Sequence, residues 1–245
     1  MKKKIVKKIV EKKVVKVTDK TVKSALPSLE DMLGAGVHFG HRASKWNPKM
    51  KPYVFTTRSN VHIIDLEKTA AKFEKALEFL RQIKKQNGTI IFVGTKIAAK
   101  DIVKKTAEEC AMPFVTERWI GGTLTNFKVI SKRLKHYRDL ENDQKTGELK
   151  KYTKKEQHDF GVQLQRLDLQ FGGIKNLTKM PDALLIIDTH KEQLALKEAR
   201  AKGILTVGLC DTDADPTLVD YPIPANDDAI SSLKLILGAI EKVLK

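Results

Sequence analysis

Residues 36–55, with the sequence GVHFGHRASKWNPKMKPYVF, concentrate side chains that could bind a metal ion or an anion. His38 and His41 are three residues apart, so on a helix their imidazoles would share one face, as in a partial metal site. No third ligand follows at a matching spacing, although Asp65 or Asp188 could approach through the fold. We therefore predict that the chain has no metal site and no cofactor.

Contact with RNA suits the same run better, because cations neutralise phosphates and planar rings stack on bases. The candidate cations are His38, His41, Arg42, Lys45, Lys49 and Lys51, and the candidate stacking rings are Trp46 and Tyr53. We predict an RNA-facing loop in which Pro48 and Pro52 restrict the backbone. The alternative is an aromatic cluster docked on the core with solvated charges around it. Both hold if Trp46 packs inward while its neighbours face the polyanion.

A second run, RWIGGTLTNF at residues 118–127, combines a flexible corner with cations. Its glycine pair permits a sharp turn, and Thr123 or Thr125 can cap the helix that follows. Free backbone N–H groups at that helix start, with Arg118 and Lys128 nearby, would clamp a phosphate. The alternative is a plain corner between a strand and a helix.

The motifs of common enzymes do not occur in the sequence. The run GTIIFVGTK at residues 88–96 fails as a phosphate-binding loop, because its first glycine precedes the strand and Lys96 does not directly follow Gly94. Residues 211–215, DTDAD, begin like a calcium loop, yet that loop's glycine and glutamate positions hold prolines, so an acidic turn is expected. No serine lies in a G-x-S-x-G elbow.

We therefore predict no catalytic residue. A helix start at Lys96 could still hold a phosphate of an RNA backbone. The alternative function is a nucleotide-dependent enzyme on a Rossmann-like core, suggested by the order of strands and helices and by the turn at Gly94.

The charge distribution favours a polyanionic partner. The 245 residues carry a net charge of +16, and the sequence pI is about 9.7. Residues 1–25 hold ten lysines against two acidic residues, whereas residues 181–245 are net acidic. The polyanion should therefore meet the first three quarters of the chain.

The cysteines and the apolar runs limit the classes of protein to which the chain can belong. Cys110 and Cys210 lie in apolar stretches without a CxxC partner, which argues against disulfides and zinc. No apolar run approaches the ~20 residues of a membrane span, and lysines interrupt the N-terminus where a secretory signal would be apolar. We expect a cytoplasmic protein.

Apolar runs alternate with amphipathic helical patterns through most of the chain. The predicted strands are 61–65, 89–93, 114–117, 183–187 and 204–209, and the predicted helices are 66–85, 97–111, 191–202 and 228–244. Because these strands are continuously apolar, we expect an α/β fold with a parallel sheet and helices on both faces.

Two long helical segments, 123–140 and 153–177, interrupt this alternation around a polar turn. Apolar residues in the second recur in steps of four and three, which predicts an inserted and protruding helical hairpin, or coiled coil. The predicted division is a basic, flexible extension at 1–25, an α/β core at 26–122 and 178–245, and the hairpin insertion at 123–177. The alternative for the extension is a short amphipathic helix.

Several runs resemble the family of the bacterial-type second protein of the small ribosomal subunit. The matching runs are GVHFGH at 36–41, WNPKMKPY at 46–53, HIIDL at 62–66, RWIGGTLTNF at 118–127, GGIK at 172–175, PDA at 181–183 and DYPIPANDDAI at 220–230. The resemblance implies a flavodoxin-like or Rossmann-like core with a protruding coiled-coil hairpin, and a structural protein without enzymatic activity, bound to ribosomal RNA. It also implies that the chain helps to dock the large mRNA-binding OB-repeat protein of the same subunit.

The resemblance also assigns RNA contacts to residues of this sequence. From the first signature come His38, His41, Arg42, Trp46, Asn47, Lys49 and Lys51, and from the second come Arg118, Thr125, Asn126 and Lys128. Lys132, Arg133 and Lys135 of the hairpin are added on charge and position alone. Residues 1–25 depart from the family pattern, and we expect them to contact RNA or a neighbouring protein.

Overall fold

The structure is a computed structural model that describes residues 20–245, and residues 1–19 of the predicted extension lie outside the described part. Its centre is a five-stranded parallel sheet with the strand order β5-β4-β6-β7-β8. The strands are β4 (Ile90–Val93), β5 (Phe114–Val115), β6 (Ala183–Ile186), β7 (Leu205–Cys210) and β8 (Tyr221–Pro224). The strand order reverses at β4, as in doubly wound Rossmann-like folds. The predicted parallel sheet is confirmed.

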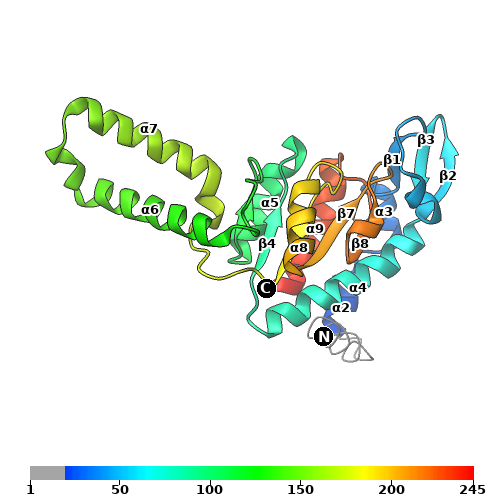
Figure 1. The fold of residues 1–245 in the computed structure, drawn as a ribbon. Coiled ribbons are helices and arrows are strands. Elements are labelled where there is room, and N and C mark those ends of the chain that lie inside the picture. Colours follow the sequence, from blue (N-terminus) through cyan, green and yellow to red (C-terminus); the bar gives the residue numbers. More distant parts are fainter. Residues whose placement is uncertain (1–19) are drawn as a thin grey trace.

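Helices cover both faces of this sheet (Figure 1). The elements packed on one face are α2 (Lys20–Ala25), α3 (Leu29–Gly34), α4 (Leu66–Lys85), α5 (Ile97–Glu109) and α9 (Ile230–Leu244). The opposite face carries α8 (Gln193–Lys202) and the base of the helical insertion. Because both faces are covered, every residue of β4 and β6 is buried, which explains their uninterrupted apolar sequences.

The last six residues of the predicted extension form α2, in which Val22 and Ala25 are buried against the core. The next helix, α3, begins with a capping box: the Ser28 hydroxyl accepts a hydrogen bond from the Asp31 N–H, and the Asp31 carboxylate accepts one from the Ser28 N–H.

A second, three-stranded sheet was not predicted from the sequence, which indicated only its strand at 61–65. The strands β1 (Phe39–Arg42) and β2 (Val54–Arg58) both pair antiparallel with β3 (Val61–Ile64), and the 3-10 helix η1 (Pro48–Tyr53) joins β1 to β2. Residues 36–55 are therefore not a loop, and the strand predicted at 61–65 lies outside the parallel sheet. Register shifts in both pairs and the exposure of most of β2 explain why no alternating pattern marks these strands.

The strand β8 was also missed, because Pro222 and Pro224 argue against a strand within a sheet. The structure places β8 at the edge, where it pairs with β7 alone. Alternate N–H groups of an edge strand point away from its neighbour, so prolines at such positions remove no hydrogen bond from the sheet.

The insertion consists of α6 (Phe127–Thr146), the 3-10 helix η2 (Glu148–Lys151) and α7 (Lys154–Phe171). The two long helices lie side by side and extend away from the sheet (Figure 1). The Tyr137 hydroxyl on α6 donates a hydrogen bond of 2.6 Å to Asp168 Oδ1 on α7. Helix α6 begins at Phe127, four residues later than the Thr123 start that the sequence suggested. A heptad-based coiled-coil seam remains a prediction.

The chain returns from the insertion through η3 (Gly172–Ile174), which packs on β5. A Cβ atom on Gly173 would lie 2.2 Å from the carbonyl oxygen of Phe114, so only glycine allows this close approach. The last short helix, η4 (Pro216–Leu218), follows β7.

Candidate nucleic-acid interface

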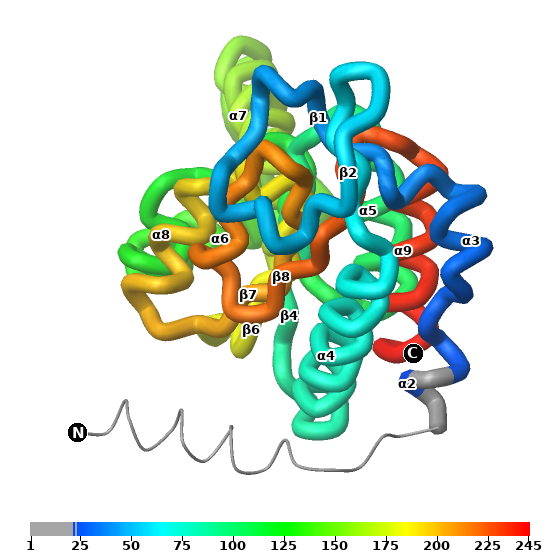
Figure 2. Tube along the Cα trace, turned by 90° about the vertical axis from the view of Figure 1, so that its right-hand side faces the viewer, coloured from blue at the N-terminus to red at the C-terminus, as the bar shows by residue number. Residues whose placement is uncertain are grey.

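The three-stranded sheet lies against the carboxyl end of β7 and β8, the edge at which doubly wound folds bind their ligands (Figure 2). The N–H of His41 donates a hydrogen bond of 2.8 Å to Thr212 Oγ1, and the N–H of Asn47 donates one of 2.8 Å to the Thr212 carbonyl. The N–H of Asn226 donates to the Val37 carbonyl at 3.0 Å. These bonds fix residues 37–47 over that edge.

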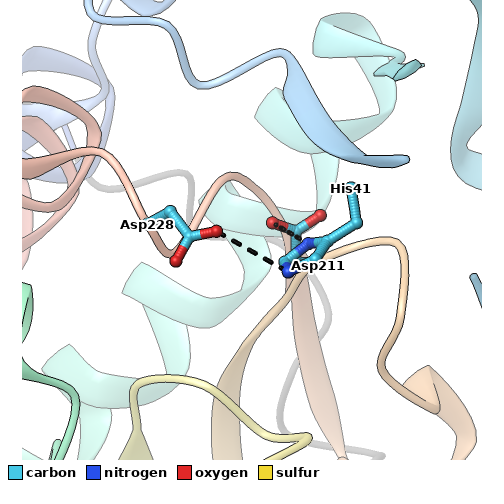
Figure 3. A group of neighbouring side chains, drawn as sticks. All are labelled: His41, Asp211 and Asp228. Atoms are coloured by element: carbon cyan, nitrogen blue, oxygen red, sulfur yellow. Dashed lines mark ion pairs between the residues drawn. The ribbon is translucent and has the colours of Figure 1, made fainter. Parts of the chain in front are cut away.

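His41 points into a group of carboxylates at this edge (Figure 3). Its Nδ1 lies 3.0 Å from Asp211 Oδ2, and its Nε2 lies 3.6 Å from Asp228 Oδ2 and 3.7 Å from Asp213 Oδ2. The Asp211 carboxylate 3.0 Å away and the surrounding negative charge raise the pKa of His41 to about 9, against the opposing effect of burial. The imidazolium charge is therefore balanced inside the protein, which weakens the predicted role of His41 as a partner for RNA phosphate.

Three of these side chains could together hold a divalent cation. Ligand atoms of His41, Asp211 and Asp228 all lie within 4.8 Å of one another. His41 would have to lose its proton for this. Asp65 and Asp188, the third ligands that the sequence suggested, do not complete such a site, because Asp65 caps α4 and Asp188 pairs with Lys96. His38 does not belong to the group.

Lys96 is held at the same edge by three carboxylates. Its Nζ lies 2.7 Å from Asp227 Oδ1, 2.5 Å from Asp228 Oδ1 and 3.7 Å from Asp188 Oδ2. Burial lowers the pKa of Lys96, but the hydrogen bonds to Asp227 and Asp228 outweigh it and raise that pKa above its ordinary value. This acidic edge would repel the phosphates of a nucleotide, and the predicted phosphate contact at Lys96 loses its cation to these partners.

Two further cations of the first run have partners in the acidic turn after β7. Lys45 Nζ lies 3.6 Å from Asp213 Oδ2, and Lys49 Nζ lies 2.6 Å from Asp215 Oδ2. Both lysines are exposed, and exposed ion pairs contribute little stability, so these side chains can exchange a carboxylate for a phosphate.

The uncharged candidates of the first run divide between packing and exposure. The Asn47 side chain caps η1 by accepting a hydrogen bond from the Lys49 N–H at 3.0 Å, which is a structural role. Trp46 keeps 36% of its surface exposed while its ring lies 5.0 Å from that of His62. Trp46 therefore packs on one side and leaves surface for stacking. Burial lowers the pKa of His38, so that side chain is a weak candidate cation.

The corner at residues 118–127 is organised by a glutamate that the sequence analysis did not consider. Glu198 on α8 is buried, and its carboxylate accepts hydrogen bonds from the N–H groups of Gly122 at 2.7 Å, Leu124 at 2.9 Å and Thr125 at 3.0 Å. The N–H groups expected to be free for a phosphate clamp therefore already bind an anion within the protein, and contact of this corner with RNA stays a prediction. The position of this glutamate within the apolar face of a predicted helix was the signal that could have revealed its role at the corner.

The side chains around this corner have separate roles. Trp119 is 4% exposed and belongs to the core, and its indole N–H lies 3.4 Å from Glu198 Oε1. The Thr125 hydroxyl also donates to Glu198, which reduces its availability for RNA. Asn126 occupies the N-cap position of α6 without a side-chain hydrogen bond there, and it is exposed.

The remaining candidates are exposed cations that no carboxylate of residues 20–245 pairs with. They are Arg42, Lys51, Arg118, Lys128, Lys132, Arg133 and Lys135. Lys128, Lys132 and Lys135 follow one another at helical spacing and so share one side of α6. Lys132 also lines, together with Arg133, a groove of about 390 Å³ between α6 and α7.

The fold and this charge layout define a class of protein. At the edge of the sheet where doubly wound folds bind ligands, the cations are paired with carboxylates of the protein itself, and the unpaired cations lie on outer surfaces. This layout is typical of a basic scaffold protein and not of a nucleotide-dependent enzyme. Among residues 20–245, no helix combines the length and the apolar character that crossing a membrane requires.

The family model for Ribosomal protein S2 matches residues 32–245. The small ribosomal subunit protein uS2 of Coprothermobacter proteolyticus is 45% identical over 216 residues, which make up 88% of this chain and 81% of that relative. The chain therefore belongs to the ribosomal protein S2 family. It is a structural, non-enzymatic constituent of the small ribosomal subunit, located on the ribosome in the cytoplasm, with ribosomal RNA and other subunit proteins as the partners that the family implies.

Proposed function

We propose that the chain is anchored in the small subunit by ribosomal RNA bound along two basic surfaces. The hairpin surface comprises Arg118, Asn126, Lys128, Lys132, Arg133 and Lys135, and the sheet surface comprises Arg42, Lys45, Trp46, Lys49 and Lys51. The observation that carries the proposal is that the cations of the hairpin surface have no carboxylate partner among the described residues. They keep their full charge for an external polyanion, and their neutralisation of phosphates would release counterions from the RNA.

The two surfaces differ in how firmly they would hold RNA. The hairpin surface offers free cations on a regular helix, so it should dominate the affinity and the salt dependence. On the sheet surface, Lys45 and Lys49 must first leave Asp213 and Asp215, while Trp46 offers a ring for stacking. We therefore assign bulk electrostatic affinity to the hairpin surface and local positioning to the sheet surface.

The test measures binding of the full chain to a transcript of the small-subunit ribosomal RNA at several salt concentrations. Each neutralised phosphate contributes roughly 0.7 to 0.9 to the log–log salt slope, so a triple variant Lys128→Ala, Lys132→Ala, Arg133→Ala should flatten that slope by about 2. Lys145→Ala is the matched control, because Lys145 lies on the same helix but pairs with Glu141 at 3.0 Å. An unchanged slope in the triple variant would contradict the proposal.

We also propose that the three-stranded sheet helps to dock the mRNA-binding OB-repeat protein of the same subunit. This proposal is supported by two exposed aromatic side chains, Phe39 at 48% and Phe55 at 75%, of the kind that anchors protein interfaces. Phe55→Ala should weaken binding of the purified OB-repeat protein in calorimetry. Leu169→Ala, which removes a similarly exposed side chain from α7, should not. Equal affinities of wild type and Phe55→Ala would refute this docking site.

A further inference from the structure

The carboxylate of Glu198 is enclosed by donors from a single corner of the chain. Glu198 is 5% exposed, and its Oε1 accepts from the Gly122 N–H at 2.7 Å and lies 3.4 Å from the Trp119 indole nitrogen. Its Oε2 accepts from the N–H groups of Leu124 and Thr125 and from the Thr125 hydroxyl at 3.2 Å. No lysine or arginine of the described residues pairs with it, so backbone and side-chain dipoles alone balance the charge.

We infer that residues 119–125 form an anion-binding nest, that Glu198 is its built-in anion, and that Glu198 is thereby a positioning residue for the hairpin surface. This inference rests on the proposed RNA binding for its functional part. The nest directly precedes Asn126 and α6, and Arg118 directly precedes the nest. The conformation of this corner therefore determines where the first cations of the hairpin surface stand relative to the core.

The backbone explains why an anion is needed at this position. Gly122 adopts a positive φ of +91°, and the N–H groups of Gly122, Leu124 and Thr125 converge on one point, the Glu198 carboxylate. Converging N–H dipoles repel one another unless a negative charge lies between them. Without the carboxylate the corner should open, and Arg118, Asn126 and Lys128 should lose their fixed positions.

Glu198→Ala in the full chain tests this inference, because it empties the nest and leaves space for a small carboxylate. We expect a lower Tm than that of wild type, and a recovery with added acetate that saturates as a binding site fills. Leu196→Ala is the matched control. It removes a buried side chain from the same helix, but that side chain packs in an apolar cluster, so acetate should not restore the Tm. Each acetate sample is compared with a sample of the same ionic strength in which chloride replaces acetate. Only a rise in Tm that exceeds both the chloride effect and the acetate effect on Leu196→Ala supports the inference.

The second readout is affinity for the small-subunit ribosomal RNA transcript, measured over the same acetate series. We expect Glu198→Ala to bind about tenfold more weakly and to recover with acetate in parallel with the Tm. Absence of a specific acetate effect on Tm would overturn the nest, and an unchanged RNA affinity would overturn the positioning role. Failure of the proposed function would be seen separately, as missing RNA binding by wild type, since the thermal recovery needs no RNA.

Glu198→Gln covers the case in which the alanine variant does not fold. Glutamine keeps the volume of the side chain but places an amide NH₂ against backbone donors and removes the charge. We expect loss of RNA affinity without recovery by acetate, because the nest stays filled. Wild-type RNA affinity in Glu198→Gln would overturn the inference.

Discussion

Replacing His41 by glutamine should remove a pH-dependent part of the stability. In the folded chain, the close contact with Asp211 and the charges of Asp211 and Asp213 raise the pKa of the imidazole to about 9, from an ordinary value of 6.5. Because the folded pKa is the higher one, the native state binds this proton more tightly than the unfolded state does. The resulting stabilisation is complete below pH 6.5 and is lost as the pH rises through 9.

The size of the effect follows from the same geometry. The pKa difference corresponds to about 3 kcal/mol in the free energy of unfolding. We reduce this to about 2 kcal/mol, because the imidazole is partly solvated and one of its partners, Asp228, is exposed to screening. The close contact, with Asp211 at 3.0 Å, should supply most of it.

Urea unfolding from pH 6 to pH 9.5, with a chelator in every buffer, provides the assay. The difference in unfolding free energy between wild type and His41→Gln should shrink by about 2 kcal/mol across that range. His158→Gln, which replaces an exposed imidazole on α7, should show a constant difference. Parallel pH profiles of wild type and His41→Gln would refute the argument that internal carboxylates hold this proton.

The remaining predictions concern packing, surface charge and two glycines; denaturant unfolding checks the stabilities, and binding of the small-subunit ribosomal RNA transcript checks the RNA affinity. Trp119→Ala should lower the unfolding free energy by about 3 kcal/mol because the indole is 4% exposed, whereas Arg42→Ala should change it by less than about 0.5 kcal/mol while weakening RNA binding. Similar stability losses in both would contradict this division of roles. Gly173→Ala should lose about 2 kcal/mol or more, since its Cβ would meet the Phe114 carbonyl oxygen at 2.2 Å. Gly161→Ala on α7, where a Cβ has no atom within 4 Å, should gain up to about 1 kcal/mol, and a loss there would contradict the helical account.

The elements that the sequence predicted well are those in which one physical signal dominates. Strands β4, β6 and β7 lie between two helical layers, so their apolar runs are continuous and identify the parallel sheet. In the three-stranded sheet only β3 gave an apolar signal, because β1 and β2 are short, irregular in register and, on β2, largely exposed. Edge strand β8 was hidden by its prolines.

The sequence shows the cations of the candidate site, whose contacts with RNA stay a prediction, but not the partners of these cations within the fold. The cations of residues 36–55 were found, yet the carboxylates that bind His41, Lys45 and Lys49 come from the turn after β7, far along the chain. Only the tertiary fold brings these segments together, so no local spacing reports them. The role of Glu198 could not be predicted for the same reason. Glu198 lies on α8, after the insertion in the sequence, and binds a corner that precedes the insertion.

The position of the insertion between β5 and β6 has a consequence for how the chain folds during its synthesis. The central pair of the sheet joins Ile90 to Ala183, so β4 leaves the synthesising ribosome before its partner strand has been made. Until both helices of the insertion have followed, β4 has one strand neighbour at most and an apolar surface on each side. Early closure of the sheet is impossible, and the nascent chain passes through a stage that is prone to misassociation. A family member that must be made in quantity for every ribosome therefore passes through this exposed stage in the middle of its own translation.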